Sequence, residues 1–195
     1  MKHVAFIVAL ALFGSGCEAV YSDRPMGTDA GADPAVWEGV WRAKDAKVGD
    51  LIRIQVTDAS TGELEITSEN DASADDGERH EEEARAFVRR HGDSTFVNIA
   101  CVDDGCGEPT AGYLWAVARF GNDTLSFWAP DAKLFGALVD LGVLPGKRDD
   151  SDVRIHALEE NDYGLIEAVL DHDVSVRDPD LELTRSADPA TEPPR

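Results

Sequence analysis

Cationic side chains are scarce in this chain of 195 residues. It has 18 Lys and Arg residues against 39 Asp and Glu residues, for a formal net charge of −21 at pH 7. Such a surface repels nucleic-acid phosphates and anionic lipid headgroups. We therefore expect no nucleic-acid partner, and we interpret the acidity as a source of solubility rather than as a cation-binding surface.

Long apolar segments are also missing. The apolar run at residues 4–13 has only ten residues, whereas a membrane-spanning helix needs about 20. Lys2 precedes this run, and the small residues Gly14, Ser15 and Gly16 follow it. A basic start, a short apolar core and small residues before a cleavage point are typical of a secretory signal peptide, which we assign to residues 1–16.

The small residues lead directly into Cys17. This arrangement resembles the lipobox of bacterial lipoproteins, in which the cysteine receives a diacylglyceryl group and becomes the new N-terminus. Ser15 and Gly16 fit that pattern, whereas Gly14 stands where an aliphatic residue is usual. The resemblance implies lipid attachment at Cys17 and a membrane partner reached through that anchor. Glu18 replaces the Asp that retains such proteins in the inner membrane, so the implied location is the outer membrane, facing the periplasm.

Two other interpretations of the first residues remain open. Ordinary cleavage after Gly16 or Ala19 would release a free periplasmic protein. Retention as a buried helix is the weaker alternative, because no polar residues give the apolar run an amphipathic face.

With Cys17 set aside, Cys101 and Cys106 form an even pair, which an oxidising compartment favours as a disulfide. The four residues between them include Asp, Asp and Gly, which form turns readily. A bond closing so short a loop contributes about 2 kcal/mol. Neither zinc-ligand spacing nor a Cys-x-x-Cys motif accompanies the pair, so we predict a structural disulfide.

The rest of the chain divides by composition. Residues 17–34 are rich in Gly, Ala, Asp and Pro, which predicts a flexible tether that holds the protein off the membrane. Residues 35–185 have enough apolar residues for one globular domain. Residues 186–195 contain three prolines and no large apolar residue, which predicts a disordered tail.

Apolar residues in the domain mostly alternate with polar ones, which predicts strands. Examples are Ile52, Ile54 and Val56, followed by a predicted turn at residues 58–62. Two segments with helical apolar spacing follow, and a last short strand is predicted at residues 181–183. The predicted fold class is a β-rich α+β domain: an antiparallel meander that curls into a barrel or sandwich, with two helices before a final strand.

The first predicted strand contains Gly39-Val40-Trp41. This Gly-x-Trp motif resembles the opening of lipocalin-type barrels, in which the tryptophan closes one end of the barrel. We expect the partner to be a small apolar ligand, with the barrel interior as one possible site, or an envelope protein. The candidate ligand-binding residues are the four tryptophans, Trp37, Trp41, Trp115 and Trp128. An ordinary core role is the competing interpretation.

Familiar catalytic motifs are absent. The sequence has no Gly-x-Ser-x-Gly, no Ser-x-x-Lys and no glycine-rich phosphate loop. The acidic segment at residues 69–83 lacks the ligand spacing of an EF-hand. Asp171-His172-Asp173 is the most enzyme-like grouping, although no second metal ligand is spaced to join it. We therefore expect no catalytic residue, cofactor or metal.

These observations predict a lipid-anchored envelope protein that binds a ligand or partner without catalysis. The alternatives are a periplasmic metal-assisted hydrolase using His172 and an acidic inhibitor of a basic protein.

Overall fold

A computed structural model describes residues 19–44, 51–70, 80–101, 112–149 and 152–186. Cys17 and Cys106 lie outside these ranges, as does the predicted tail after Ser186, so the predicted lipid attachment, disulfide and disordered end fall outside the described residues.

The described residues form more strands than helices. The strands are β1 (Val20–Ser22), β2 (Thr28–Asp29), β3 (Gly39–Ala43), β4 (Leu51–Asp58), β5 (Glu63–Asn70), β6 (His80–His91), β7 (Ser94–Cys101), β8 (Gly112–Phe120), β9 (Thr124–Trp128), β10 (Gly146–Asp149), β11 (Asp152–Ile155) and β12 (Leu181–Arg185). The helices are α2 (Pro34–Trp37), α3 (Ala132–Asp140) and α4 (Glu160–Val176).

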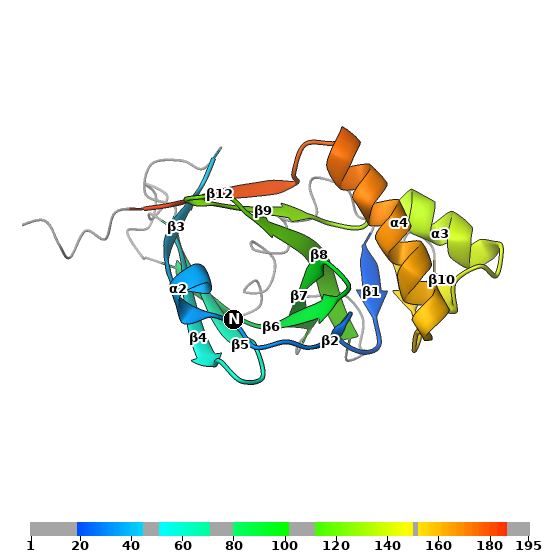
Figure 1. Cartoon of the computed structure of the whole chain (residues 1–195), viewed down its shortest axis with the longest axis horizontal. Coiled ribbons are helices and arrows are strands. Elements are labelled where there is room, and N and C mark those ends of the chain that lie inside the picture. Colours follow the sequence, from blue (N-terminus) through cyan, green and yellow to red (C-terminus); the bar gives the residue numbers. More distant parts are fainter. Residues whose placement is uncertain (1–18, 45–50, 71–79, 102–111, 150–151, 187–195) are drawn as a thin grey trace, which may run out of the picture.

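Eight of the strands close into an antiparallel barrel (Figure 1). Strands β3 to β9 pair with their neighbours in sequence, and β12 pairs with both β3 and β9. The pairing of β8 with β9 completes the ring. The prediction of a β-rich fold with an antiparallel meander is therefore confirmed, and its form is a barrel.

The turn between β4 and β5 shows how local sequence sets the strand register. Asp58 Oδ1 accepts hydrogen bonds from the backbone N–H groups of Ser60 and Thr61 at 2.8 and 3.2 Å. Gly62 has a φ of +72°, and a Cβ there would lie 2.5 Å from the carbonyl oxygen of Ala30. The predicted turn at residues 58–62 is therefore confirmed, and only glycine fits its last position.

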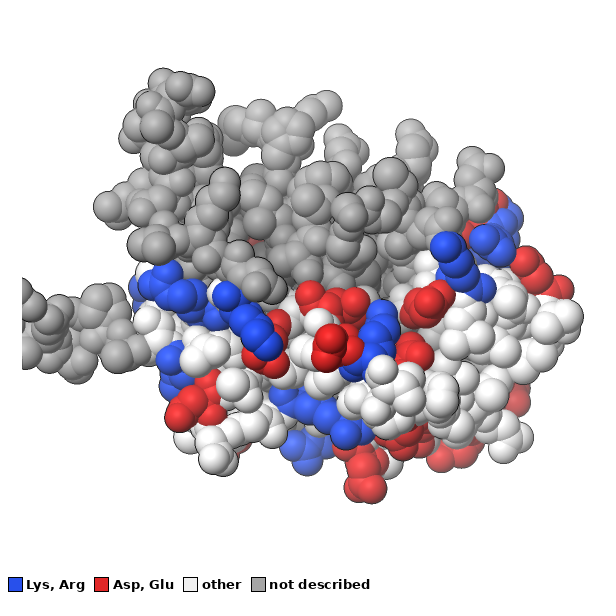
Figure 2. Space-filling view, turned by 90° about the horizontal axis from the view of Figure 1, so that it is seen from above, with Lys and Arg blue, Asp and Glu red and all other residues white. Residues whose placement is uncertain are grey.

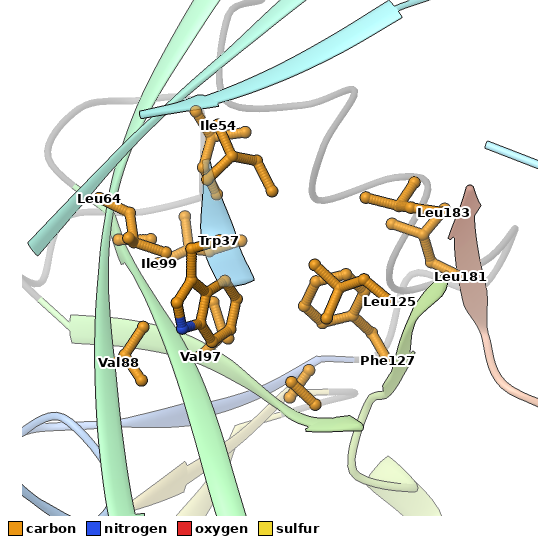
Figure 3. Close-up of a cluster of buried hydrophobic side chains, with 14 of the residues drawn as sticks. Trp37, Ile54, Leu64, Val88, Val97, Ile99, Leu125, Phe127, Leu181 and Leu183 are labelled. Atoms are coloured by element: carbon orange, nitrogen blue, oxygen red, sulfur yellow. The ribbon is translucent and has the colours of Figure 1, made fainter. Parts of the chain in front are cut away.

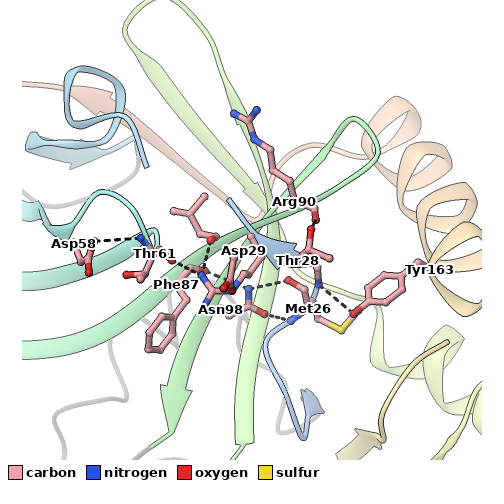
Figure 4. Close-up of polar contacts among 12 residues, drawn as sticks. Met26, Thr28, Asp29, Asp58, Thr61, Phe87, Arg90, Asn98 and Tyr163 are labelled. Atoms are coloured by element: carbon pink, nitrogen blue, oxygen red, sulfur yellow. Dashed lines mark hydrogen bonds and ion pairs between the residues drawn. The ribbon is translucent and has the colours of Figure 1, made fainter. Parts of the chain in front are cut away.

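Residues 19–34 are part of the fold, so the prediction that this segment is a flexible tether is wrong. Strand β1 lies between β8 and β11, with Val20 fully buried. Met26 is also buried, and the side chain of Asn98 bonds to both its backbone N–H, at 2.6 Å, and its carbonyl oxygen, at 3.2 Å (Figure 4). Val20 and Met26 hold this mostly polar segment in place, because their side chains are buried against the outside of the barrel.

Helices α3 and α4 cover one side of the barrel together with β10 and β11 (Figure 1). They enclose a second core outside the barrel wall, built around Phe96, Trp115, Phe135, Ile166 and Leu170. The helices therefore contribute to this outer core and leave the barrel interior to the strands. Among the described residues, no helix is long and apolar enough to cross a bilayer.

Replacing Met26 with alanine tests whether this segment carries folding energy. We expect Met26→Ala to lower the free energy of unfolding by about 2–5 kcal/mol, because it opens a cavity in the outer core. Urea denaturation measures the change, with the exposed neighbouring Arg24→Ala as the control. Equal stability of the two variants would contradict the packing of residues 19–34 described above.

Candidate ligand site in the barrel interior

The inner face of the barrel is apolar and is lined largely by aliphatic side chains. Alternation along each strand points every second side chain inward. Figure 3 shows part of this lining on opposite walls: Leu64, Val88, Val97 and Ile99 on one side, and Leu125, Phe127, Leu181 and Leu183 on the other. These residues come from five strands (β5, β6, β7, β9 and β12), so the site is assembled by the closure of the ring.

Several inward positions on one wall carry very small side chains. They are Ala86 on β6 and Ala116 and Ala118 on β8, each almost fully buried. An eight-stranded barrel is just wide enough either to be filled by its own side chains or to hold one small ligand. The alanine side chains at these positions reach less far into the interior than the leucine, isoleucine and valine side chains beside them.

One end of the barrel is plugged by aromatic residues. The indole N–H of Trp41 on β3 donates to the carbonyl oxygen of Trp37 in α2 at 3.2 Å. The Arg185 guanidinium lies 4.6 Å from the centre of the Trp41 ring and donates to the carbonyl oxygens of Glu38 and Val36, both at 2.8 Å. A single cation therefore ties β12 to the tryptophan ring and to α2.

Gly39 permits this plug. Its φ is +149°, and a Cβ at that position would approach the Arg185 guanidinium to 3.3 Å. Both the backbone conformation and the space beside the arginine favour glycine at this position. Within the Gly39-Val40-Trp41 motif, the absence of a side chain at Gly39 leaves space for the Arg185 guanidinium, which lies over the Trp41 ring.

At the opposite end of the barrel, β3 leads to β4, β5 to β6, and β7 to β8. Residues 45–50, 71–79 and 102–111 make these connections and lie outside the described residues. Most of the acidic segment at residues 69–83 also lies outside the described side chains.

The four candidate tryptophans do not form one site. Trp37 and Trp41 meet in the barrel plug, and Phe120 packs edge-on against Trp37 at a centroid distance of 4.7 Å. Trp115 points away from the interior into the outer core, against Phe135. Trp128 also belongs to the outer face, and its indole N–H donates to the carbonyl oxygen of Arg177 at 3.1 Å. Of the four predicted residues, two therefore border the interior.

Sequence reasoning missed Ser68, a polar residue on the inner wall. It follows Leu64 and Ile66 in the inward series of β5 and is 3% exposed. Its hydroxyl has no hydrogen-bond partner among the described residues. The signal was present in the sequence, because the spacing of two from Leu64 and Ile66 assigns Ser68 to the same face.

The outer surface carries mixed charges. Figure 2 shows basic and acidic side chains side by side over the described part of one face. Several are paired across strands, including Arg85 with Glu63 at 2.6 Å and Lys44 with Glu182 at 3.1 Å. Exposed pairs of this kind add little stability, so their main effect is a hydrated exterior.

The grouping of Asp171, His172 and Asp173 does not converge on a shared site. His172 is exposed, Asp171 pairs with Arg119 at 3.2 Å, and Asp173 lies 3.7 Å from Arg177. Within the described ranges, no group of three or more His, Cys, Asp or Glu side chains is arranged to hold a metal ion.

A charged contact that sequence analysis did not predict fastens α4 to the end of β6. His91 lies between two helix carboxylates, 3.3 Å from Glu160 and 3.2 Å from Glu167. Its ring stacks on Tyr163 at a centroid distance of 4.5 Å. Burial lowers the pKa of the His91 imidazole, but Glu167 and Glu160 together outweigh it, so the pKa is raised above its ordinary value.

Comparison of the chain with known protein families, with curated proteins and with solved structures finds no match. The functional argument therefore rests on the geometry of the barrel and its side chains.

The His91 contact predicts a pH dependence of stability. Because the pKa of His91 is higher in the folded state, its contribution is complete below the unfolded pKa of about 6.5 and is lost as pH rises through the folded pKa. We expect His91→Gln to remove this part of the decline in urea-denaturation free energy between about pH 6 and 9. His172→Gln, at an exposed position on α4, is the control and should keep the wild-type slope. Identical profiles for wild type and His91→Gln would contradict the contact.

Proposed function

We propose that the protein is a non-enzymatic binding protein that holds a small apolar molecule inside its barrel, and that a lipid on Cys17 anchors it in the bacterial envelope. The observation that carries the binding proposal is the set of alanines on the inner wall of a closed barrel with one plugged end. The Gly-x-Trp resemblance to lipocalin-type barrels agrees with this proposal.

The interior suits an uncharged, largely hydrocarbon ligand. Each methylene moved from water into such an interior contributes about 0.8 kcal/mol. An eight-carbon chain therefore gains enough to offset the several kcal/mol that association costs. The Trp37 and Trp41 plug gives the site a blind end.

The anchoring proposal places the barrel close to the bilayer. The backbone N–H of Ala19 donates to Asp152 at 3.1 Å, and the carbonyl oxygen of Ala19 accepts from Val153 at 2.9 Å. Two residues of extended chain span at most about 7 Å. A lipid on Cys17 would therefore hold the β1–β11 side of the barrel against the membrane surface, where apolar molecules are concentrated.

Binding of the neutral fluorophore N-phenyl-1-naphthylamine tests the interior site. We expect saturable fluorescence enhancement with the wild-type domain and an affinity at least 10-fold weaker for Ala116→Phe, whose ring occupies the interior. Ala168→Phe on the exposed face of α4 is the matched control and should bind as the wild type does.

The stability of Ala116→Phe separates a hollow interior from a filled one. Adding a large side chain to a filled core costs about 1–3 kcal/mol or more. We expect no loss of unfolding free energy in Ala116→Phe. A strongly destabilised variant, together with no binding by the wild type, would contradict the proposal.

Mass spectrometry of the full chain expressed in a Gram-negative host tests the anchor. We expect loss of residues 1–16 and an acylated Cys17 at the new N-terminus, with Cys17→Ser remaining unacylated. An unmodified, soluble mature wild-type chain would contradict the anchor and leave the binding proposal intact.

A further inference from the structure

Ser68 differs from the other buried polar residues of the described chain. Three polar side chains are buried there: Ser22, Ser68 and Asn98. Asn98 makes three hydrogen bonds, to the backbone of Met26 and to the carbonyl oxygen of Phe87. The Ser22 hydroxyl donates to the carbonyl oxygen of Tyr113 at 3.5 Å. Of these three side chains, Ser68 alone has no partner among the described atoms; outside the barrel, the indole N–H of the fully buried Trp115 also lacks one.

The missing partner of the Ser68 hydroxyl matters because Ser68 lies on the inner wall of the barrel. Along β5 the inward series is Leu64, Ile66 and Ser68, running from the turn end toward the end opposite the plug. The other described lining residues between the plug and Ser68 are apolar. A buried hydroxyl without a partner is costly, so such groups are usually bonded to protein, water or a ligand.

We infer that Ser68 bonds a polar group of the bound molecule, so that the ligand is an uncharged amphiphile with one hydroxyl or carbonyl group. This inference rests on the proposed binding function. The apolar chain then points toward Trp37 and Trp41, and the polar group lies at Ser68, toward the end opposite the plug.

A pair of ligands that differ by one hydroxyl tests the inference. Affinities of 1-octanol and octane are measured by displacement of N-phenyl-1-naphthylamine from wild type and from Ser68→Ala. We expect the preference for 1-octanol relative to octane to fall by about 3- to 10-fold in Ser68→Ala, the range for one net hydrogen bond. Thr67→Ala, which removes a hydroxyl from the outward face of the same strand, should keep the wild-type preference.

The ligand-free proteins supply a second measurement. If the Ser68 hydroxyl serves to bind a ligand, Ser68→Ala leaves the thermal unfolding midpoint of the ligand-free domain unchanged or raises it. A structural serine would give a lower midpoint in Ser68→Ala, which would overturn the inference.

The outcomes also separate this inference from the proposed function. Binding of both ligands to wild type and Ser68→Ala with the same relative preference would overturn the role of Ser68 and leave the interior site standing. No binding of any of the three probes to the wild type would overturn both.

Discussion

Closure of the sheet by β12 is the constraint on which the rest of the structure depends. This strand follows α3 and α4 in the chain, and it pairs with β3 on one edge and β9 on the other. Without β12, the edges of β3 and β9 would be unpaired, and the inward-facing side chains of Trp41 and Leu125 would be exposed to water. Closure converts a meander into a ring with a distinct inside, and it brings Arg185 over the ring of Trp41.

Closure also separates two apolar cores with different roles. The outer core is packed with large side chains such as Phe96, Trp115 and Phe135, and it fastens the N-terminal segment and both long helices to the barrel. The inner core is lined by leucine, isoleucine, valine and alanine side chains, with Ser68 among them. Because the helices pack outside, they stabilise the barrel without occupying its interior.

The sequence predicts local features of this fold well and distant contacts poorly. Period-two alternation at Ile52 and Ile54 and the turn at residues 58–62 depend on neighbouring residues, and the structure confirms them. The burial of Met26 depends on Asn98, 72 positions away, so composition alone misassigned residues 19–34. The tryptophans show the same limit: Trp41 faces the barrel interior and Trp115 faces the outer core, a distinction that only closure of the sheet decides.

Native mass spectrometry of the full-length protein, extracted from a bacterial membrane in mild detergent, tests the central claim most directly. The account predicts a non-covalent adduct of one small, neutral, apolar molecule that organic solvent removes and that Ala116→Phe fails to retain. A bare polypeptide under the same conditions, or an adduct retained equally by Ala116→Phe, would contradict a ligand site inside the barrel.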